Sequence, residues 1–293
     1  MTPVARRRRR EEIKITIGPF RSNSDYGSCV DIQREVWRFE DIDLVPVATL
    51  MVVDRCGGIV LGAYSAIGEM IGFVCSFLGI EDGDLIQHSH MLAVRMAYRN
   101  FDVGFRLKLA QRKEALKRKI RRITWTFDPM QPPNAYFNLG KLGAWSAKYE
   151  EDFYGESTSV LHHGLPTDRF LTCWDLDSKE VEKRLEEGPS AHDLRKELKK
   201  YICINTLEEV APGMATCANL KMNCTAPEFL FEIPHNLPDL KNRSLSVALD
   251  WQGKMRQVFR TYFKKGYAAT DFWVSEDEGR HRGFYFLHKK RAR

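Results

Sequence analysis

A long apolar run in the first third of the chain sets the first limit on the fold. Residues 59–80 read IVLGAYSAIGEMIGFVCSFLGI and are nearly enough to cross a bilayer as a helix. Glu69 lies at the centre of the run, and four glycines interrupt it. A carboxylate in the middle of a membrane span is costly, and the many β-branched and aromatic residues favour strands. We therefore predict two buried strands joined by a tight turn, with no membrane span.

Size and composition predict a globular protein with more than one domain. The chain has 293 residues, of which 43% are hydrophobic, 11% aromatic and 29% charged. This composition excludes a chiefly disordered, collagenous or disulfide-rich chain. The seven cysteines are scattered and never spaced as CxxC, and the initial MTPVARRRRREE lacks the apolar core of a signal peptide. We expect no zinc ribbon, no disulfide framework and a location in the cytoplasm.

Hydrophobic periodicity predicts a chain of mixed strands and helices. Alternating or short apolar runs predict strands at 13–17, 50–53, 59–64, 70–78, 85–94, 122–127, 147–149, 170–174, 229–233, 267–274 and 284–288. Apolar residues at helical spacing predict helices at 25–37, 104–119, 134–142 and 245–262. The second helix is expected to bury a stripe of Phe105, Leu109, Leu116 and Ile120.

Shifts in composition predict four regions along the chain. They are a basic tail at 1–12, a first α/β domain at 13–176, a charged linker or helix at 177–201, and a smaller α/β domain at 202–293. The tail contains an arginine run at 6–10, and the chain ends in HKKRAR. Both ends are interpreted as solubilising segments.

The most informative stretch is a predicted strand, loop and basic helix. From Arg95 to Arg122 it carries eleven lysines and arginines against Asp102 and Glu114, a local net charge of +9. A loop that leads into a helix presents unpaired backbone N–H groups and the positive end of the helix dipole. Such a site suits a phosphate or pyrophosphate. A solvated basic face is the alternative. A nucleic-acid site is not expected, because aromatic platforms and helix-turn-helix or zinc-finger spacings are missing.

The same stretch resembles the acyl-CoA-binding segment of the GNAT acetyltransferase superfamily. VRMAYRNFDVG, followed by FRLKLAQ, is similar to the family's strand, loop and helix with the pattern R/Q-x-x-G-x-G/A. Asn134-Ala135 and Leu142-Gly143 are similar to the pairs at the start and end of the family's next helix. The resemblance covers residues 13–175 and looks closest to a poorly characterised subgroup with WTFDP, FNLGKLGA and FYG.

The resemblance implies a mixed, splayed sheet flanked by helices, with a cleft for acetyl-CoA or another acyl-CoA. Backbone groups of Met91, Leu92 and Val94 would pair with pantetheine as an added strand would. Asn134 would reach the cofactor from the other side. The loop that would wrap the pyrophosphate comprises Arg99, Asn100, Phe101, Asp102, Val103, Gly104 and Phe105.

Two positions depart from the family pattern. Asp102 stands where the pattern has its first glycine, and Leu139 stands where many members have a tyrosine that protonates the leaving thiolate. A carboxylate close to a pyrophosphate would be repelled by on the order of 1 to 4 kcal/mol at about 4 Å. These departures favour a second interpretation, a non-catalytic module of the same fold that binds a ligand or a partner.

Several side chains are candidates for acid–base roles. His88 and His90 alternate on one strand face, and a neutral imidazole is a suitable base for an ammonium substrate. Tyr136 and Tyr149 are the nearest hydroxyls that could replace the thiolate acid. Ordinary hydrogen bonding or packing is the alternative for all four. Asp128, which precedes a proline, suits a turn better than catalysis.

The sequence thus predicts acyl transfer from acyl-CoA to an amine by direct attack on the thioester. The amine would belong to a small molecule or to an amino terminus. Its identity, the acyl chain length and the oligomeric state stay open. His162-His163 is interpreted as part of a loop, because two adjacent side chains do not converge on a metal ion, and no metal is expected.

Overall fold

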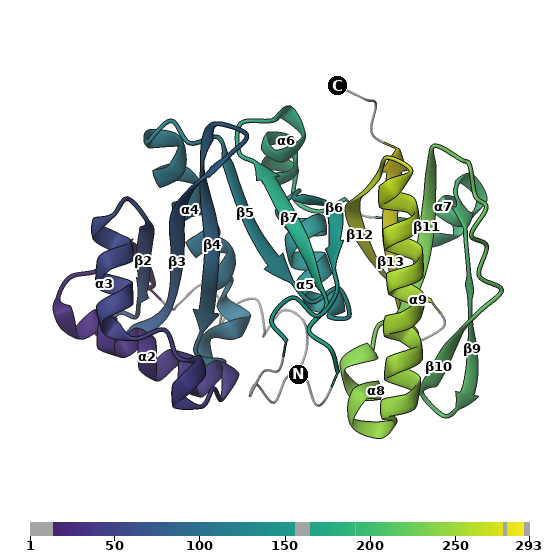
Figure 1. Ribbon diagram of the computed structural model, residues 1–293, viewed down its shortest axis with the longest axis horizontal. Coiled ribbons are helices and arrows are strands. Elements are labelled where there is room, and N and C mark those ends of the chain that lie inside the picture. The colour runs from purple at the N-terminus through teal and green to yellow at the C-terminus, as the bar shows by residue number, and fades with distance from the viewer. Residues whose placement is uncertain (1–13, 156–164, 191, 278–279, 290–293) are drawn as a thin grey trace. The chain divides into compact units, whose positions relative to one another are not determined.

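The computed structural model describes residues 14–155, 165–190, 192–277 and 280–289. The chain divides into two compact units, the first ending at Trp125 and the second beginning at Thr126 (Figure 1). The basic tail, residues 156–164 with His162-His163, and the last four residues lie outside the described ranges. The domain boundaries predicted near residues 12, 176 and 201 stay predictions.

The first unit contains a mixed sheet with the strand order β1-β2-β3-β4-β5. Strands β1 to β4 pair antiparallel with their sequence neighbours, whereas β5 is parallel to β4 and is reached through a crossover helix. Its elements are β1 (Thr16–Pro19), α2 (Asn23–Trp37), η1 (Asp41–Asp43), α3 (Val47–Arg55), β2 (Ile59–Tyr64), β3 (Met70–Glu81), β4 (Asp84–Val94), η2 (Met96–Phe101), α4 (Val103–Lys117) and β5 (Arg122–Phe127).

Turn chemistry fixes the hairpins of this sheet. Asp82 and Gly83 have φ angles of 51° and 87°, the left-handed pair that an Asp-Gly turn supplies between two strands. The turn between β2 and β3 contains Gly68 at φ 86°. The long apolar run is therefore two strands and a turn, as predicted. None of the helices in the described ranges is both long enough and apolar enough to cross a membrane.

Helices cover both faces of the first sheet. Met91 and Ala93 on β4 belong to the buried cluster formed with α2 and α3. Leu92 and Val94 lie beside Gly104 at the start of α4. Because successive side chains of a strand point to opposite faces, α4 packs on the face opposite to α2 and α3.

The second unit contains a mixed sheet with the order β7-β6-β12-β13-β11-β8, and a separate hairpin of β9 and β10. All its pairs are antiparallel except β11 with β8. Its elements are α5 (Pro132–Ala135), η3 (Tyr136–Lys141), β6 (Trp145–Glu150), β7 (Arg169–Asp175), α6 (Lys179–Glu187), α7 (Leu194–Lys200), β8 (Ile202–Cys203), β9 (Thr206–Ala211), β10 (Met214–Ala218), β11 (Glu228–Pro234), α8 (Leu237–Arg243), α9 (Leu245–Lys264), β12 (Tyr267–Asp277) and β13 (Arg280–Lys289).

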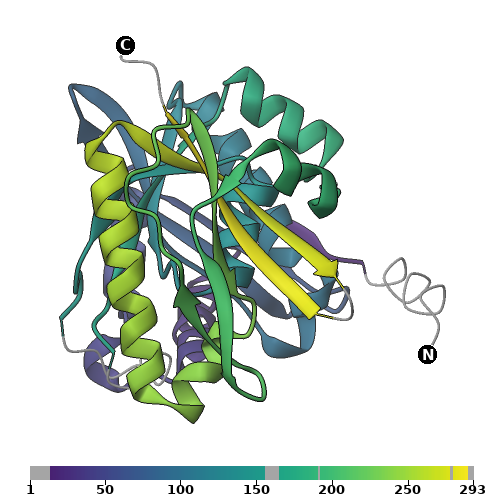
Figure 2. The same ribbon diagram turned by 90° about the vertical axis from the view of Figure 1, so that its right-hand side faces the viewer.

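The core of the second unit is built around α9. Trp251, Met255, Val258 and Tyr262 follow one another on this helix at steps of four, three and four residues, and this stripe is fully buried. It packs into one apolar cluster with residues of β11, β12 and β13, and Figure 2 shows α9 running alongside these strands. Ser244 caps the helix by accepting a hydrogen bond from the Val247 N–H group. The predicted α/β class with a mixed sheet and flanking helices is thus confirmed in both units.

Two predictions about helices were wrong. Residues 50–53 belong to α3, because a four-residue apolar run is too short to distinguish a strand from a turn of helix. On α4 the buried face carries Val103, Leu107, Gln111 and Ala115 together with Lys108, whereas the predicted stripe is only half-buried within the helix. The side of α4 that faces the core includes the polar side chains of Lys108 and Gln111, so it differs from the predicted apolar stripe.

Candidate active site

Strand β4 carries an irregularity beside the two candidate histidines. Cys75 pairs with Met91 and Ser76 pairs with Ser89, so His90 is an extra residue on β4. This arrangement is a β-bulge, a feature that often lies next to active sites because it turns a strand and redirects its side chains. The bulge explains why Ser89 faces α4 whereas Met91 faces α2 and α3.

Beyond this point β4 presents an edge. Its pairing with β5 consists of Gln87 with Ile123 and His88 with Thr124. In the described part of the chain, β4 then continues to Val94 with register partners on β3 alone. An unpaired strand edge offers backbone N–H and C=O groups to an extended, amide-bearing ligand. The edge includes Met91, Leu92 and Val94, which were predicted to pair with pantetheine.

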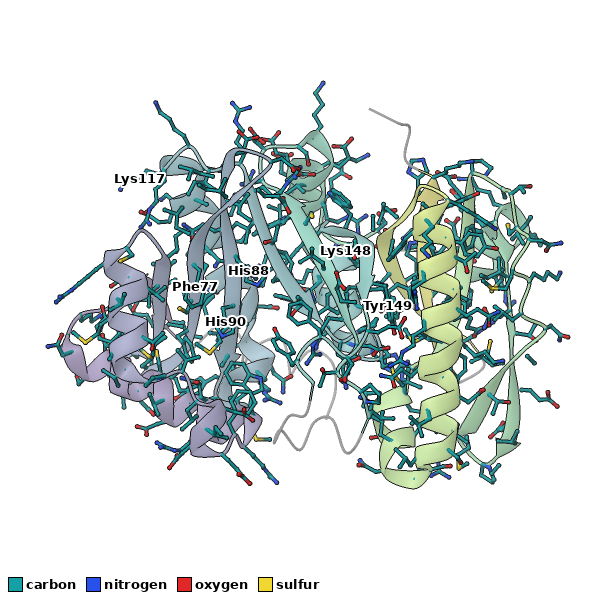
Figure 3. All side chains as sticks on the ribbon, in the orientation of Figure 1. Phe77, His88, His90, Lys117, Lys148 and Tyr149 are labelled. Carbon is teal, nitrogen blue, oxygen red and sulfur yellow. The ribbon has the colours of Figure 1, made fainter. Side chains whose placement is uncertain are left out.

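The two histidines lie on the same face of β4, next to Phe77 of β3 (Figure 3). The His88 Nδ1 atom is 3.0 Å from the Thr124 Oγ1 atom, and the His90 ring meets the Phe77 ring edge-on at 5.5 Å. Burial lowers the pKa of His88, and the positive charges of His90 and Lys108 lower it further. Burial also lowers the pKa of His90. Both imidazoles are therefore predominantly neutral at pH 7 and can accept a proton.

The predicted cofactor loop follows β4 directly. Residues 96–101 form the 3-10 helix η2, and Asp102 then adopts a left-handed conformation with φ 55° and ψ 20°. Glycine or aspartate takes this conformation at less cost than most residues. The Arg106 N–H group donates to the Asp102 carbonyl, and this bond begins α4. The amides of Val103 and Gly104 precede it, at the helix start where anions bind. Arg99 and Asp102 are both exposed.

Behind the loop lies a buried lysine that the sequence analysis did not single out. Lys108 is 3% exposed, and its Nζ atom lies 2.8 Å from the Ser89 Oγ atom and 3.1 Å from the Gln111 Oε1 atom. It also lies 4.0 Å from the centre of the Trp125 ring. Burial lowers the pKa of Lys108 to about 7. The network fixes α4 against the bulged part of β4.

The remaining candidates lie in the second unit. Asn134 is exposed on α5, and Leu139 is fully buried in the core. Tyr136 lines a cavity with Arg184 and Asp271. Burial and the charge of Asp271 raise the pKa of the Tyr136 hydroxyl, and Arg184 opposes them.

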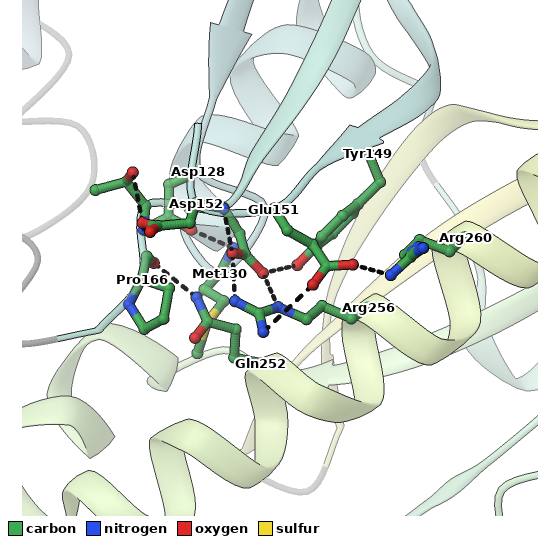
Figure 4. Close-up of polar contacts among 11 residues, drawn as sticks. Asp128, Met130, Tyr149, Glu151, Asp152, Pro166, Gln252, Arg256 and Arg260 are labelled. Atoms are coloured by element: carbon green, nitrogen blue, oxygen red, sulfur yellow. Dashed lines mark hydrogen bonds and ion pairs between the residues drawn. The ribbon is translucent and has the colours of Figure 1, made fainter. Parts of the chain in front are cut away.

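Tyr149 and Asp128 have structural partners (Figure 4). The Tyr149 hydroxyl donates to the Asp168 carboxylate at 2.6 Å, and burial raises its pKa well above the ordinary value. Asp128 accepts a hydrogen bond from the Met130 N–H group at 2.8 Å and one from the buried Lys241 ammonium at 3.1 Å. Tyr149 is thus committed to a carboxylate, and Asp128 shapes a turn, as its sequence context indicates. Within the described ranges, no group of three or more His, Cys, Asp or Glu residues is placed to hold a metal ion.

No family model matches the sequence, and no curated protein matches it. Among solved structures, the chain is similar to the ribosomal-protein-S18-alanine N-acetyltransferase of Escherichia coli, with 14% identity, a TM-score of 0.45 and coverage of 56% of this chain and 96% of that chain. It is similar to Ard1 of Thermoplasma volcanium, with 15% identity, a TM-score of 0.41 and coverage of 54% of this chain and 95% of that chain. It is also similar to Naa50 of Arabidopsis thaliana, in complex with the bisubstrate analogue CoA-Ac-MVNAL. The identity is 14%, the TM-score is 0.43, and the match covers 54% of this chain and 97% of that chain.

A further match covers only 13% of the other chain, a fungal multi-domain GH3 beta-N-acetylglucosaminidase with a GCN5-related glucosamine N-acetyltransferase region. Among the three structures described before it, the Escherichia coli protein is an N-acetyltransferase and Naa50 was solved with a CoA-containing analogue. Likeness of this degree concerns the fold alone.

Proposed function

We propose that this protein is an acyl-CoA-dependent N-acyltransferase that transfers an acetyl or other acyl group to an amine. The observation that carries the proposal is the succession of a bulged strand with a free edge, a left-handed turn and a helix start within residues 84–106. An acyl-CoA needs these features in this order, because its amide-bearing arm is joined to a pyrophosphate. The cytoplasm stays the expected compartment on the sequence grounds given above.

The phosphate end of the ligand would lie at the start of α4. The N–H groups of Val103 and Gly104 and the helix dipole favour an anion there. The exposed Arg99 side chain would add a charge-assisted hydrogen bond. Asn134 stays a residue that the resemblance implies for the ligand. The backbone of Met91, Leu92 and Val94 would pair with the pantetheine amides.

The chemical step uses the two histidines. A neutral His90 or His88 imidazole would accept a proton from the substrate ammonium, which leaves a free amine. The amine nitrogen would attack the thioester carbonyl carbon, the C–N bond would form, and the C–S bond would break. The proton that the nitrogen loses as the neutral amide forms would pass to the CoA thiolate, which leaves as the free thiol. Leu139 is buried and apolar, so no side chain is assigned to this transfer at the position of the family's usual acid.

The second candidate is a ligand-binding module of the same fold without catalysis. Two observations favour it: Asp102 carries a negative charge at the predicted phosphate site, and Leu139 occupies the position of the family's usual acid. The two functions differ in turnover. Release of free CoA thiol, measured with acetyl-CoA and a broad panel of amines, is expected for the enzyme. Binding of acetyl-CoA without thiol release would favour the module.

Replacement of Arg99 by alanine is expected to weaken acetyl-CoA binding by about 10- to 100-fold. The reason is the loss of a charge-assisted contact with phosphate, worth roughly 1.5 to 3 kcal/mol. Calorimetric titration measures the change. Lys113→Ala is the matched control, because it removes one exposed positive charge from α4, about three turns beyond the start of that helix. Equal affinities for Arg99→Ala and Lys113→Ala would place the phosphates elsewhere.

A further inference from the structure

The second unit contains a cavity that the proposed reaction does not use as a binding site. It has a volume of about 750 Å³ and is lined by residues of α5, η3, α6, β12 and the connections around α7 and α8. This volume lies in the range of cavities that bind small organic molecules, roughly 300 to 1,000 Å³. Every lining residue belongs to the second unit, so the cavity exists independently of the β4 site.

Buried polar atoms without a partner are concentrated at this cavity. Among the described residues, four buried side-chain nitrogen or oxygen atoms have no hydrogen-bond partner. Three of them belong to lining residues: His192 Nε2, His235 Nδ1 and Trp273 Nε1. Such atoms are rare in folded proteins, because an unpaired buried polar atom loses the hydrogen bonds that it makes with water in the unfolded chain. Their gathering around one cavity indicates a ligand that supplies the missing partners.

The Trp273 indole is held firmly in place. Its ring is 4% exposed and is stacked between the His192 ring, at 4.0 Å, and the Phe286 ring, at 5.0 Å. Other indoles of this unit donate to protein acceptors, as Trp174 does to the Leu142 carbonyl and Trp251 to the Ala215 carbonyl. Trp273 is therefore a preorganised donor that lacks an acceptor.

The unpaired atoms select a ligand that accepts hydrogen bonds. An indole N–H group can only donate, and an imidazole nitrogen donates in one tautomer. The carboxylate in the lining is already engaged, since Asp271 accepts two hydrogen bonds from Arg184, at 3.1 and 2.8 Å, and one from the Phe272 N–H group. The His192 Nε2 atom lies 3.8 Å from Asp271, beyond hydrogen-bond distance. The carboxylate charge is thus balanced, and the donors remain open.

The rest of the lining is apolar. Pro132, Pro133, Phe272 and Val274 contribute to the wall. We propose that this cavity binds a small organic carboxylate with an apolar body, whose oxygens accept hydrogen bonds from Trp273, His192 and His235. The site does not depend on acyl-CoA.

A spectroscopic titration of the full chain tests the site directly. The protein has six tryptophans, and a ¹H–¹⁵N spectrum resolves their indole N–H signals. The variant Trp273→Phe assigns the signal of Trp273 by its disappearance. Benzoate is the probe, and benzamide, which has the same shape and no charge, is the control. Benzoate is expected to shift the Trp273 signal to saturation, with an affinity at least about 10-fold higher than that of benzamide.

A second variant keeps the test decisive if Trp273→Phe does not fold. His235→Ala, followed by the same indole signal, is expected to weaken benzoate binding by several-fold. No shift of any indole signal with benzoate, or equal affinities for benzoate and benzamide, would overturn the carboxylate site. The titration contains no acetyl-CoA, so its outcome is separate from that of the acyltransferase proposal.

Discussion

Replacement of both His88 and His90 by glutamine is expected to lower the rate of acetyl transfer by about 100-fold or more, while acetyl-CoA binding is retained. Glutamine has a similar length and can keep a hydrogen bond to Thr124, but it cannot accept a proton from an ammonium group. The two single variants measure how much of this loss of rate each histidine accounts for. His90→Gln should cause the larger loss, because His90 lies in the bulge and is the more solvent-accessible of the two, whereas the His88 ring is held by Thr124.

The pH dependence of turnover distinguishes a base from a structural histidine. Since burial lowers the pKa of both rings, each imidazole is neutral and active as a base above that pKa. The rate should therefore fall on the acid side, as the pH decreases through the lowered pKa, and this acid limb should disappear in the double variant. A double variant with wild-type turnover, or an unchanged acid limb, would remove both histidines from the mechanism.

Replacement of Asp168 by alanine is expected to destabilise the protein by about 3 to 5 kcal/mol, because it leaves the buried Tyr149 hydroxyl and the half-buried Arg256 guanidinium without their shared partner. The Asp168 side chain is 1% exposed and accepts hydrogen bonds from Arg256 at 2.6 and 2.7 Å and from the Tyr149 hydroxyl at 2.6 Å. It also accepts one from the Asp152 N–H group. Urea unfolding measures the loss as a lower midpoint.

Glu151→Ala is the matched control for this change. Glu151 also forms ion pairs with Arg256, at 3.5 Å, and with Arg260, but its side chain is 34% exposed. Ion pairs in contact with water contribute about 0 to 1 kcal/mol, so this variant should unfold close to the wild-type midpoint. Equal midpoints for Asp168→Ala and Glu151→Ala would contradict the central role of Asp168.

The sequence predicted the elements of the first unit where local signals are strong. The short apolar runs placed β4 to within one residue and β3 to within three residues of their observed ends. The buried face of α4 was missed, because Lys108 and Gln111 are buried through hydrogen bonds to Ser89, which lies 19 and 22 residues away in the chain. Such a long-range pairing leaves no trace in the spacing of apolar residues.

Pairing between residues far apart in the chain also explains which features of the candidate sites the sequence did not predict. The bulge at His90 depends on the register between two strands, and no residue type marks it. The partner of Tyr149 is held by Arg256, 88 residues from Asp168 in the sequence. The cavity around Trp273 gathers residues from positions 132 to 275. Residues 99–105, predicted as a loop, comprise the end of η2, the left-handed Asp102 and the start of α4, and their role in binding a phosphate stays a prediction.

The most direct test of the account is calorimetric titration of acetyl-CoA into the wild-type protein and into Asp102→Gly. Glycine adopts the left-handed conformation of residue 102 freely and removes a negative charge from the predicted phosphate site. Asp102→Asn is the matched variant, because it removes the charge and still tolerates this conformation. The account predicts that the wild-type protein binds acetyl-CoA and that both variants bind it about 5- to 10-fold more tightly. No detectable binding to the wild-type protein or to Asp102→Gly would contradict the acyltransferase assignment.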